Sequence, residues 1–155
     1  MLAFDTSALV SLSVGRVLPQ ALAIVKPVVT KTVLKELRSM ASVKDELGMA
    51  AASALTQLSD VRVERVRREQ TAEKELLLVV KRKRATTLVT DDLGPVRMAE
   101  ASGVDAMFSV HVLYLLHQRG RVTRGEALAA LERMRLGRVW KQNVIYQAAA
   151  DLFGI

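Results

Sequence analysis

Short apolar segments alternate with helical segments along the first 108 residues of this chain, which has 155 residues in all. The apolar segments have the composition or the two-residue alternation of strands, and they span 2–4, 27–29, 61–66, 88–90 and 104–108. Helices are predicted between them, starting with the turn 8–12 and continuing over 18–25, 31–40, 42–58, 71–80 and 96–101. Strands that alternate with helices form a parallel sheet with helices on both faces. The sequence therefore predicts an α/β fold with a central parallel sheet.

Local features of the α/β segment refine this prediction. Thr6 and Ser7 are expected to cap the first helix through their hydroxyls. Pro27 opens the second strand, which is typical of a strand at the outside of a sheet. Gly48 is expected to weaken the helix 42–58 slightly, because glycine has a low helix propensity.

The rest of the chain is predicted to be helical, over 110–118, 124–136 and 143–153. Thr123 and Glu126 form a capping box at the start of the second of these helices. We expect this helical tail to pack against the sheet or against a partner. Because no repeat or linker divides the chain, we expect a single domain, with an α/β core over 1–108 and a helical C-terminal extension over 109–155.

The charge and the cysteine content narrow the class of protein. The net charge is +7 and the isoelectric point is near 10.1. Such a charge favours binding to a polyanion such as nucleic acid, but it could also serve only to keep the protein soluble. The absence of cysteine excludes disulfides, thiol catalysis and zinc–thiolate sites. Asp5 interrupts the first apolar segment and no basic residue precedes it, so no signal peptide is evident and we expect a cytoplasmic protein.

Acidic residues occupy corresponding places after four of the predicted strands. These residues are Asp5, Glu36, Glu73 and the adjacent pair Asp91 and Asp92, of which the pair is expected to run into a glycine turn. Because the carboxyl ends of parallel strands meet at one edge of a sheet, these side chains can lie close together. Carboxylates crowded into one crevice are unstable unless they are protonated or bound to a cation. The pattern therefore favours an oxygen-rich site for Mg²⁺ or Mn²⁺.

Simpler interpretations exist for several of these residues. Glu36 borders an apolar helix face and could be an ordinary solvated side chain, while Glu73 and Glu75 would be stabilised by the helix dipole without any function. His111 and His117 lie six residues apart on different faces of a helix, so they do not form a metal pair.

Basic residues surround the third acid. The segment 61–84 holds nine Lys or Arg against four Glu, and it ends in Lys81, Arg82, Lys83 and Arg84. These four residues would either stabilise the end of a helix through a favourable interaction with its dipole or bind the phosphates of a nucleic acid, and both interpretations stay open. A metal site with walls that attract phosphate fits the hydrolysis of phosphodiester bonds.

Several motifs in this order resemble the PIN-domain nucleases. They are Asp5-Thr6-Ser7, Val33-Leu34-Lys35-Glu36-Leu37 and Thr90-Asp91-Asp92. The segment 72–77 is similar to the Gly-Glu-x-Glu-Ala-Ile helix start of a compact archaeal and bacterial subgroup that includes VapC-like toxins, and Gly103-Val104 and the segment 112–120 also have counterparts there. The resemblance covers nearly the whole chain.

The resemblance implies a three-layer α/β/α sandwich and a Mg²⁺- or Mn²⁺-dependent ribonuclease. Such a protein is often a homodimer and often the toxin of a toxin–antitoxin pair, so RNA, most simply single-stranded, and an antitoxin are the partners implied. Carried over by position, the catalytic acids are Asp5, Glu36, Glu73 and Asp92, and the metal ligands are Asp5, Glu73, Asp91 and Asp92. The supporting residues are Asp91, Thr6, Ser7 and Thr90, and the nucleic-acid-binding residues are Lys81, Arg82, Lys83 and Arg84.

Some alternatives remain open within this resemblance. The sequence does not decide between Glu73 and Glu75, or between Asp91 and Asp92, as the primary ligand. Ala72 stands where the subgroup has glycine, which leaves room for a PIN-like module that binds nucleic acid without cleaving it. A phospho-receiver domain also carries acids on a parallel sheet, but its acid pair follows the first strand, whereas here the pair comes late.

Overall fold

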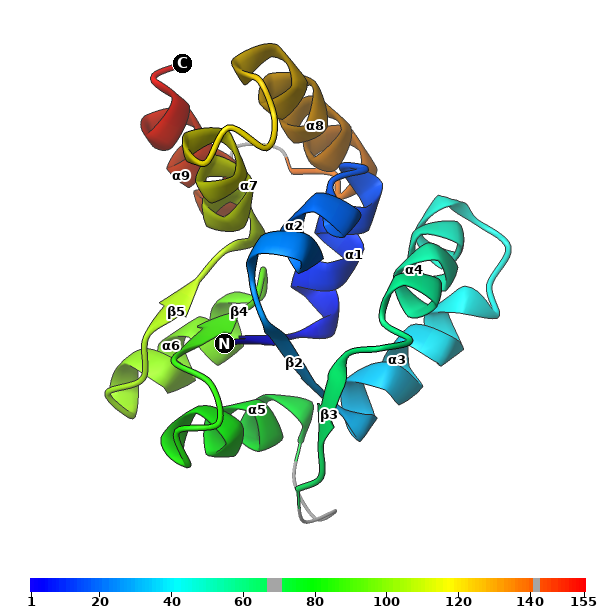
Figure 1. Cartoon of the computed structure of the whole chain (residues 1–155), viewed down its shortest axis with the longest axis vertical. Coiled ribbons are helices and arrows are strands. Elements are labelled where there is room, and N and C mark those ends of the chain that lie inside the picture. Colours follow the sequence, from blue (N-terminus) through cyan, green and yellow to red (C-terminus); the bar gives the residue numbers. More distant parts are fainter. Residues whose placement is uncertain (67–70, 141–142) are drawn as a thin grey trace.

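The computed structural model describes residues 1–66, 71–140 and 143–155 (Figure 1). The strands in this part of the chain are β1 (Leu2–Phe4), β2 (Pro27–Thr30), β3 (Arg62–Glu64), β4 (Thr87–Val89) and β5 (Ala106–Met107). The helices of the α/β segment are α1 (Thr6–Val14), α2 (Leu18–Ile24), α3 (Lys31–Ala41), α4 (Glu46–Gln57), α5 (Ala72–Lys81) and α6 (Leu93–Ala101). The helices of the tail are α7 (Ser109–Gln118), α8 (Arg124–Gly137) and α9 (Val144–Phe153).

The sheet is parallel and has the strand order β3-β2-β1-β4-β5. The chain therefore adds strands on one side of β1 first and then returns to add β4 and β5 on the other side. This reversal makes the boundary between β1 and β4 a topological switch point, and ligands of open α/β sheets bind at the carboxyl ends of the strands there. Phe4 pairs with Val89 in this register, so that Asp5 and Thr90 follow side by side.

Helices cover both faces of the sheet. Figure 1 shows α5 and α6 on one side, and α1, α3 and α4 on the other. This division follows from the strand order, because right-handed crossovers running in opposite directions along a sheet place their helices on opposite faces. The predicted α/β fold with a central parallel sheet is therefore confirmed.

The tail helices gather at one end of the molecule (Figure 1). Helices α7 and α8 contact each other and α1, and α9 packs on α7. The capping box of α8 is present as expected, since Glu126 N donates to Thr123 Oγ1 and Thr123 N donates to Glu126 Oε2. The helical tail predicted from the sequence thus packs against the α/β segment. Within the described residues, none of the helices has the length and apolar character that crossing a membrane requires.

Some sequence-based predictions about the strands and one turn were wrong. Strand β2 lies between β1 and β3, not at the outside of the sheet, and it tolerates Pro27 because proline is its first residue. Strand β3 is shorter than 61–66 and mostly exposed, since it is the outermost strand. Gly94 lies in the first turn of α6 and forms no separate glycine turn.

The helix predicted over 42–58 begins four residues late, at Glu46, because Asp45 caps it by accepting a hydrogen bond from Gly48 N (2.7 Å). Gly48 is needed in this turn. A Cβ atom at this position would lie 1.8 Å from the carbonyl oxygen of Val43. The glycine that the sequence suggested to be a weakness of the helix therefore permits the tight turn between α3 and α4.

We expect Gly48→Ala to lower the free energy of unfolding by about 1–3 kcal/mol, because the backbone of the turn must shift to admit a methyl group. Gly125→Ala is the matched control, since the nearest atom to a Cβ there is Thr123 Oγ1 at 4.0 Å. That substitution lies in the first turn of α8 and should be neutral or stabilising by up to about 1 kcal/mol. Urea denaturation of both variants measures the difference, and equal stabilities would contradict the role given to Gly48.

Candidate active site

Asp5 lies at the carboxyl end of β1, where the chain enters α1. Its Oδ1 accepts a hydrogen bond from Thr6 N (2.8 Å), and its Oδ2 accepts one from Thr90 Oγ1 (2.8 Å) and a longer one from Ser7 Oγ (3.4 Å). The N-cap of α1 is therefore Asp5 itself, and the prediction that Thr6 and Ser7 cap this helix was wrong. Their hydroxyls are used elsewhere in the site.

The Asp5 carboxyl is buried, with 4% of the residue exposed. Burial, together with the nearby charges of Asp92 and Glu36, raises its pKa to about 6. Hydrogen bonds from Thr90 and from the backbone of Thr6 oppose this rise. The site therefore holds negative charge that water solvates poorly, and a bound cation would offset it.

Glu36 reaches the same place from the middle of α3. Thr6 Oγ1 donates a hydrogen bond of 2.6 Å to Glu36 Oε2, and this bond joins two residues that are 30 positions apart. The charge of Glu36 also contributes to the raised pKa of Asp5. Its partner on α1 distinguishes Glu36 from an ordinary solvated side chain at the border of an apolar face.

The two adjacent acids after β4 differ in their surroundings. Asp92 is exposed at the N-cap of α6, where its charge acts on Asp5 and its backbone N–H donates to Thr90 Oγ1 (3.2 Å). Asp91 is buried, and its carboxylate accepts hydrogen bonds from Ser109 N (2.8 Å) and Ser109 Oγ (2.6 Å) at the start of α7. Burial raises the pKa of the Asp91 carboxyl, and the hydrogen bonds from Ser109 oppose this.

Glu73 and Glu75 both lie in the first turn of α5, after the N-cap Thr71. Helix α5 packs on β1, β2 and β4, and Glu75 belongs to its buried residues with 4% of its surface exposed, whereas Glu73 is half-buried. Burial therefore favours Glu75 as the acid of this helix that faces the sheet. Its spacing of three residues from Ala72 and four from Val79, both buried, puts it on the apolar face of the helix, and this spacing is the sequence signal that points to it.

The basic run 81–84 lies away from these acids. Helix α5 starts after the carboxyl end of β3 and leads back to the start of β4, so its last residues are at the amino edge of the sheet. Thr86 N donates to Met1 O (2.9 Å), which fixes this segment beside the start of the chain. Lys81, Arg82, Lys83 and Arg84 are exposed there, at the opposite edge from Asp5. The structure therefore does not bring them to the acidic site.

Within the described residues, no group of three or more acidic or imidazole side chains is close enough to hold a metal ion. The donor chemistry nevertheless fits a hydrated Mg²⁺ ion, which commonly binds through one or two carboxylates, several waters and the phosphates of its substrate. Asp5 and Asp92 are the two carboxylates that this mode of binding would use.

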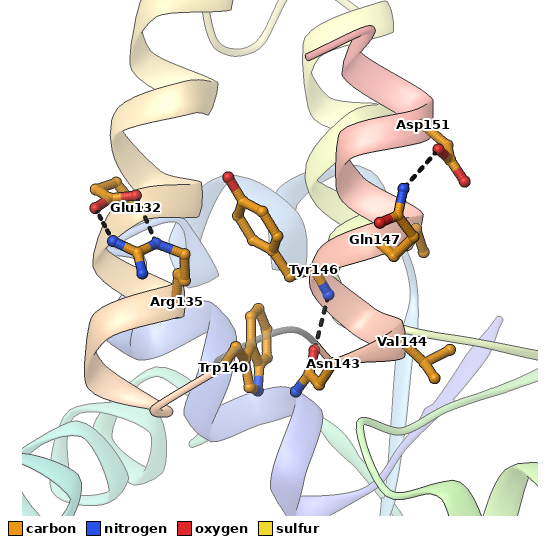
Figure 2. Close-up of a pocket in the computed structure, with 9 residues that line it drawn as sticks. Glu132, Arg135, Trp140, Asn143, Val144, Tyr146, Gln147 and Asp151 are labelled. Atoms are coloured by element: carbon orange, nitrogen blue, oxygen red, sulfur yellow. Dashed lines mark hydrogen bonds and ion pairs between the residues drawn. The ribbon is translucent and has the colours of Figure 1, made fainter.

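A hollow away from the acidic residues lies between α8 and α9 and has a volume of about 1140 Å³. Its charged side chains are engaged with their neighbours (Figure 2), since Arg135 Nε donates to Glu132 Oε2 (2.9 Å) and Gln147 Nε2 donates to Asp151 Oδ1 (3.0 Å). Trp140 lines this groove with only 5% of its surface exposed. It acts as an anchor for the tail, and the carboxylates at the sheet edge remain the better candidate for catalysis.

The fold and the acids at its switch point define a class of α/β protein with a carboxylate site between two central strands. A family model described as PIN domain matches residues 1–154, and the chain therefore belongs to the PIN-domain family, which has a nuclease-like fold. No curated protein matches the chain. A solved structure that matches is a domain of a functionally unknown protein from Methanocaldococcus jannaschii DSM 2661, with 18% sequence identity, a TM-score of 0.49, and coverage of 69% of this chain and 89% of that chain.

We expect Asp5→Asn to stabilise the metal-free protein at neutral pH. A carboxyl with a raised pKa binds its proton more tightly in the folded chain than in the unfolded chain, so the fold loses stability as the pH rises from about 4, the ordinary pKa of an aspartate, to about 6. The difference between these two pKa values corresponds to about 3 kcal/mol of stability at pH 7, and this loss is recovered as the pH falls from about 6 towards 4. The variant has no carboxyl that ionises at this position, so its free energy of unfolding should exceed that of the wild type at pH 7 and approach it at pH 4.

Urea denaturation in EDTA between pH 4 and pH 7 measures this difference. Asp60→Asn is the control, because Asp60 is an exposed aspartate just before β3, at the amino edge of the sheet. Asp91 also contributes to the pH dependence, but equally in the wild type and in both variants. Parallel pH profiles for the wild type and Asp5→Asn would contradict the burial argument.

Proposed function

We propose that this protein is an endoribonuclease that hydrolyses RNA phosphodiester bonds with Mg²⁺ or Mn²⁺ held by carboxylates at the switch point. The observation that carries the proposal is the environment of Asp5, a buried carboxyl whose pKa is raised to about 6 beside the charges of Asp92 and Glu36. Membership of the PIN-domain family supports a nuclease over other proteins with acids on a parallel sheet.

Each side chain of the site has a distinct task in this proposal. Asp5 and Asp92 would hold the cation, and a bound divalent cation supplies Lewis acidity toward water and phosphate. Thr6 and Thr90 keep the Asp5 carboxylate in one orientation through their hydrogen bonds of 2.8 Å to its two oxygens. Glu36, whose carboxylate accepts the hydrogen bond from the Thr6 hydroxyl, would accept a proton from an attacking water.

Exposed cations at the same edge of the sheet would bind the RNA backbone. Lys31 directly follows β2, and Arg65 directly follows β3, so both lie at the carboxyl ends of strands. Lys and Arg bind phosphates without reading the base sequence, which suits a single-stranded RNA substrate. The basic run 81–84 would contact only an RNA that extends around the molecule to the other edge.

The wild-type protein is expected to cleave single-stranded RNA with Mg²⁺ or Mn²⁺ and to lose cleavage in EDTA. Asp5→Asn and Asp92→Asn should each lower kcat/KM by at least 100-fold, because each removes a charge that holds the cation. Asp60→Asn should retain full activity, since it makes the same chemical change at the opposite edge. Cleavage is measured on a labelled RNA by gel electrophoresis, and full activity in both site variants would refute this site.

Glu75→Gln is expected to reduce cleavage more than Glu73→Gln, because only the first of these residues is nearly fully buried on the sheet side of α5. The two substitutions are chemically identical and lie in the same helical turn, so each is the control for the other. We expect at least a 10-fold difference in kcat/KM between the variants. The opposite order would return the third acid to Glu73, as the family resemblance first suggested.

A non-catalytic module that binds nucleic acid is the second candidate function. It is favoured by the finding that the described residues hold no ready-made group of three metal ligands. Such a module would bind RNA in EDTA, with an affinity that falls steeply as the salt concentration rises. It would not cleave RNA, whichever metal ion is added. Binding measured by fluorescence anisotropy beside the cleavage assay separates the two functions.

The role as a toxin, the antitoxin partner and the homodimer stay predictions that derive from the family resemblance. A small antitoxin reading frame directly upstream would support the toxin role. Light scattering of the purified protein measures the oligomeric state.

A further inference from the structure

Helix α7 is capped only in part by its own side chains: His111 Nδ1 accepts a hydrogen bond from Phe108 N (3.2 Å), while the N–H of Ser109 takes its side-chain acceptor from another part of the chain. Its N-cap residue is Phe108, which carries no hydrogen-bond acceptor in its side chain. The first N–H groups of a helix need acceptors from elsewhere, and Asp and Asn are among the residues that best supply them. Here the acceptor comes from Asp91, which lies 18 positions earlier in the chain, at the end of β4.

Asp91 holds the start of α7 through both of its carboxylate oxygens. Oδ1 accepts from Ser109 N (2.8 Å) and Oδ2 accepts from Ser109 Oγ (2.6 Å). Ser109 is fully buried, and 8% of Asp91 is exposed. Hydrogen bonds to an ionised carboxylate are about twice as strong as neutral ones, and this pair is shielded from competing water.

The backbone of Asp91 is held from the other side by the site itself. Its N–H donates to Ser7 Oγ (2.9 Å), and the same hydroxyl lies 3.2 Å from Thr90 Oγ1 and 3.4 Å from Asp5 Oδ2. A continuous series of hydrogen bonds thus runs from α7 through Asp91 and Ser7 to Asp5. Asp91 is also the residue between Thr90 and Asp92, so its position sets the direction of both neighbours.

We propose that Asp91 is a positioning residue that acts through Ser109, and that it is not a metal ligand. The proposal rests on the proposed function, because what it positions are Asp92 and Asp5 for a cation. In this proposal the helical tail contributes to the site, because Ser109 at the start of α7 holds Asp91 and so fixes the turn after β4. It also assigns different tasks to the two acids between which the sequence did not decide the primary metal ligand.

The affinity for Mn²⁺, measured by calorimetry without RNA, distinguishes a positioning residue from a ligand. We expect Asp91→Ala and Ser109→Ala each to weaken Mn²⁺ binding about 10-fold, as is typical when a partner of a metal ligand is lost. The double variant should bind no more weakly than Asp91→Ala alone, because Asp91→Ala already removes both hydrogen bonds, and Ser109→Ala removes only the one that the Ser109 hydroxyl donates. Ser109→Thr keeps the hydroxyl and should restore most of the affinity.

Unchanged Mn²⁺ affinity in Ser109→Ala, together with a loss in Asp91→Ala, would overturn the proposal and return Asp91 to the ligands. Ser102→Ala, at an exposed serine beyond α6, is the control for the loss of a hydroxyl. Asp91→Asn, which preserves the shape of the side chain, replaces Asp91→Ala if that variant does not fold. With RNA, the positioning variants should lower kcat and leave KM within about 2-fold, because neither residue would bind the substrate.

The wild-type protein, Asp91→Ala, Ser109→Ala and the double variant form a double-mutant cycle, in which the free energy of unfolding is measured in EDTA. A coupling between Asp91 and Ser109 is expected, and additive effects would contradict the hydrogen-bonded pair. If the wild-type protein neither binds Mn²⁺ nor cleaves RNA, the proposed function fails, and this cycle still tests whether Asp91 acts through Ser109.

Discussion

The pairing of β1 with β4 is the constraint on which the candidate site depends. These two strands are 85 positions apart in the chain, and their register sets Thr90 beside Asp5 so that the threonine hydroxyl donates to the aspartate (2.8 Å). The pairing is available because the chain reverses its direction of strand addition between β1 and β4. At such a switch point the helices that follow the two strands leave on opposite faces, which opens a place for polar side chains at the end of the sheet.

The carboxyl ends of β1 and β4 are an unfavourable environment for an ionised carboxylate, because Asp5 is buried there. The surrounding residues donate hydrogen bonds to Asp5 but do not neutralise its charge. Thr6, Ser7 and Thr90 direct hydrogen-bond donors to Asp5, yet its pKa remains raised because burial and two nearby carboxylates outweigh them. A set of donors that only satisfied the carboxylate would have lowered the pKa instead. The fold thus retains a site that costs stability when ionised, which is a pattern typical of functional sites.

Much of this arrangement was predictable from the sequence, for reasons that are specific to parallel sheets. The apolar segments before Asp5 and Asp91 are strands, and parallel strands bring their carboxyl ends together whatever lies between them in the chain. Glu36 of α3 reaches the site from the border of the apolar face of its helix, and this position can be read from the helical periodicity of the local sequence. The burial of Glu75 also had a signal in the sequence, since Glu75 lies three residues from Ala72 and four from Val79 on one helix face, but the family resemblance directed the prediction to Glu73.

Other features depend on contacts that a linear pattern does not contain. The need for Gly48 arises from the carbonyl of Val43 in a turn whose path the sequence does not specify. The different surroundings of Asp91 and Asp92 depend on Ser109, which belongs to the tail and lies 18 positions from Asp91 in the chain. The position of the basic run 81–84, in contrast, follows from the order of the strands. A crossover helix that starts at the carboxyl edge of a parallel sheet must end at the amino edge. The positive charge of this run therefore lies at the amino edge, where it would raise the general attraction of a polyanion to the protein without reaching the carboxylates around Asp5.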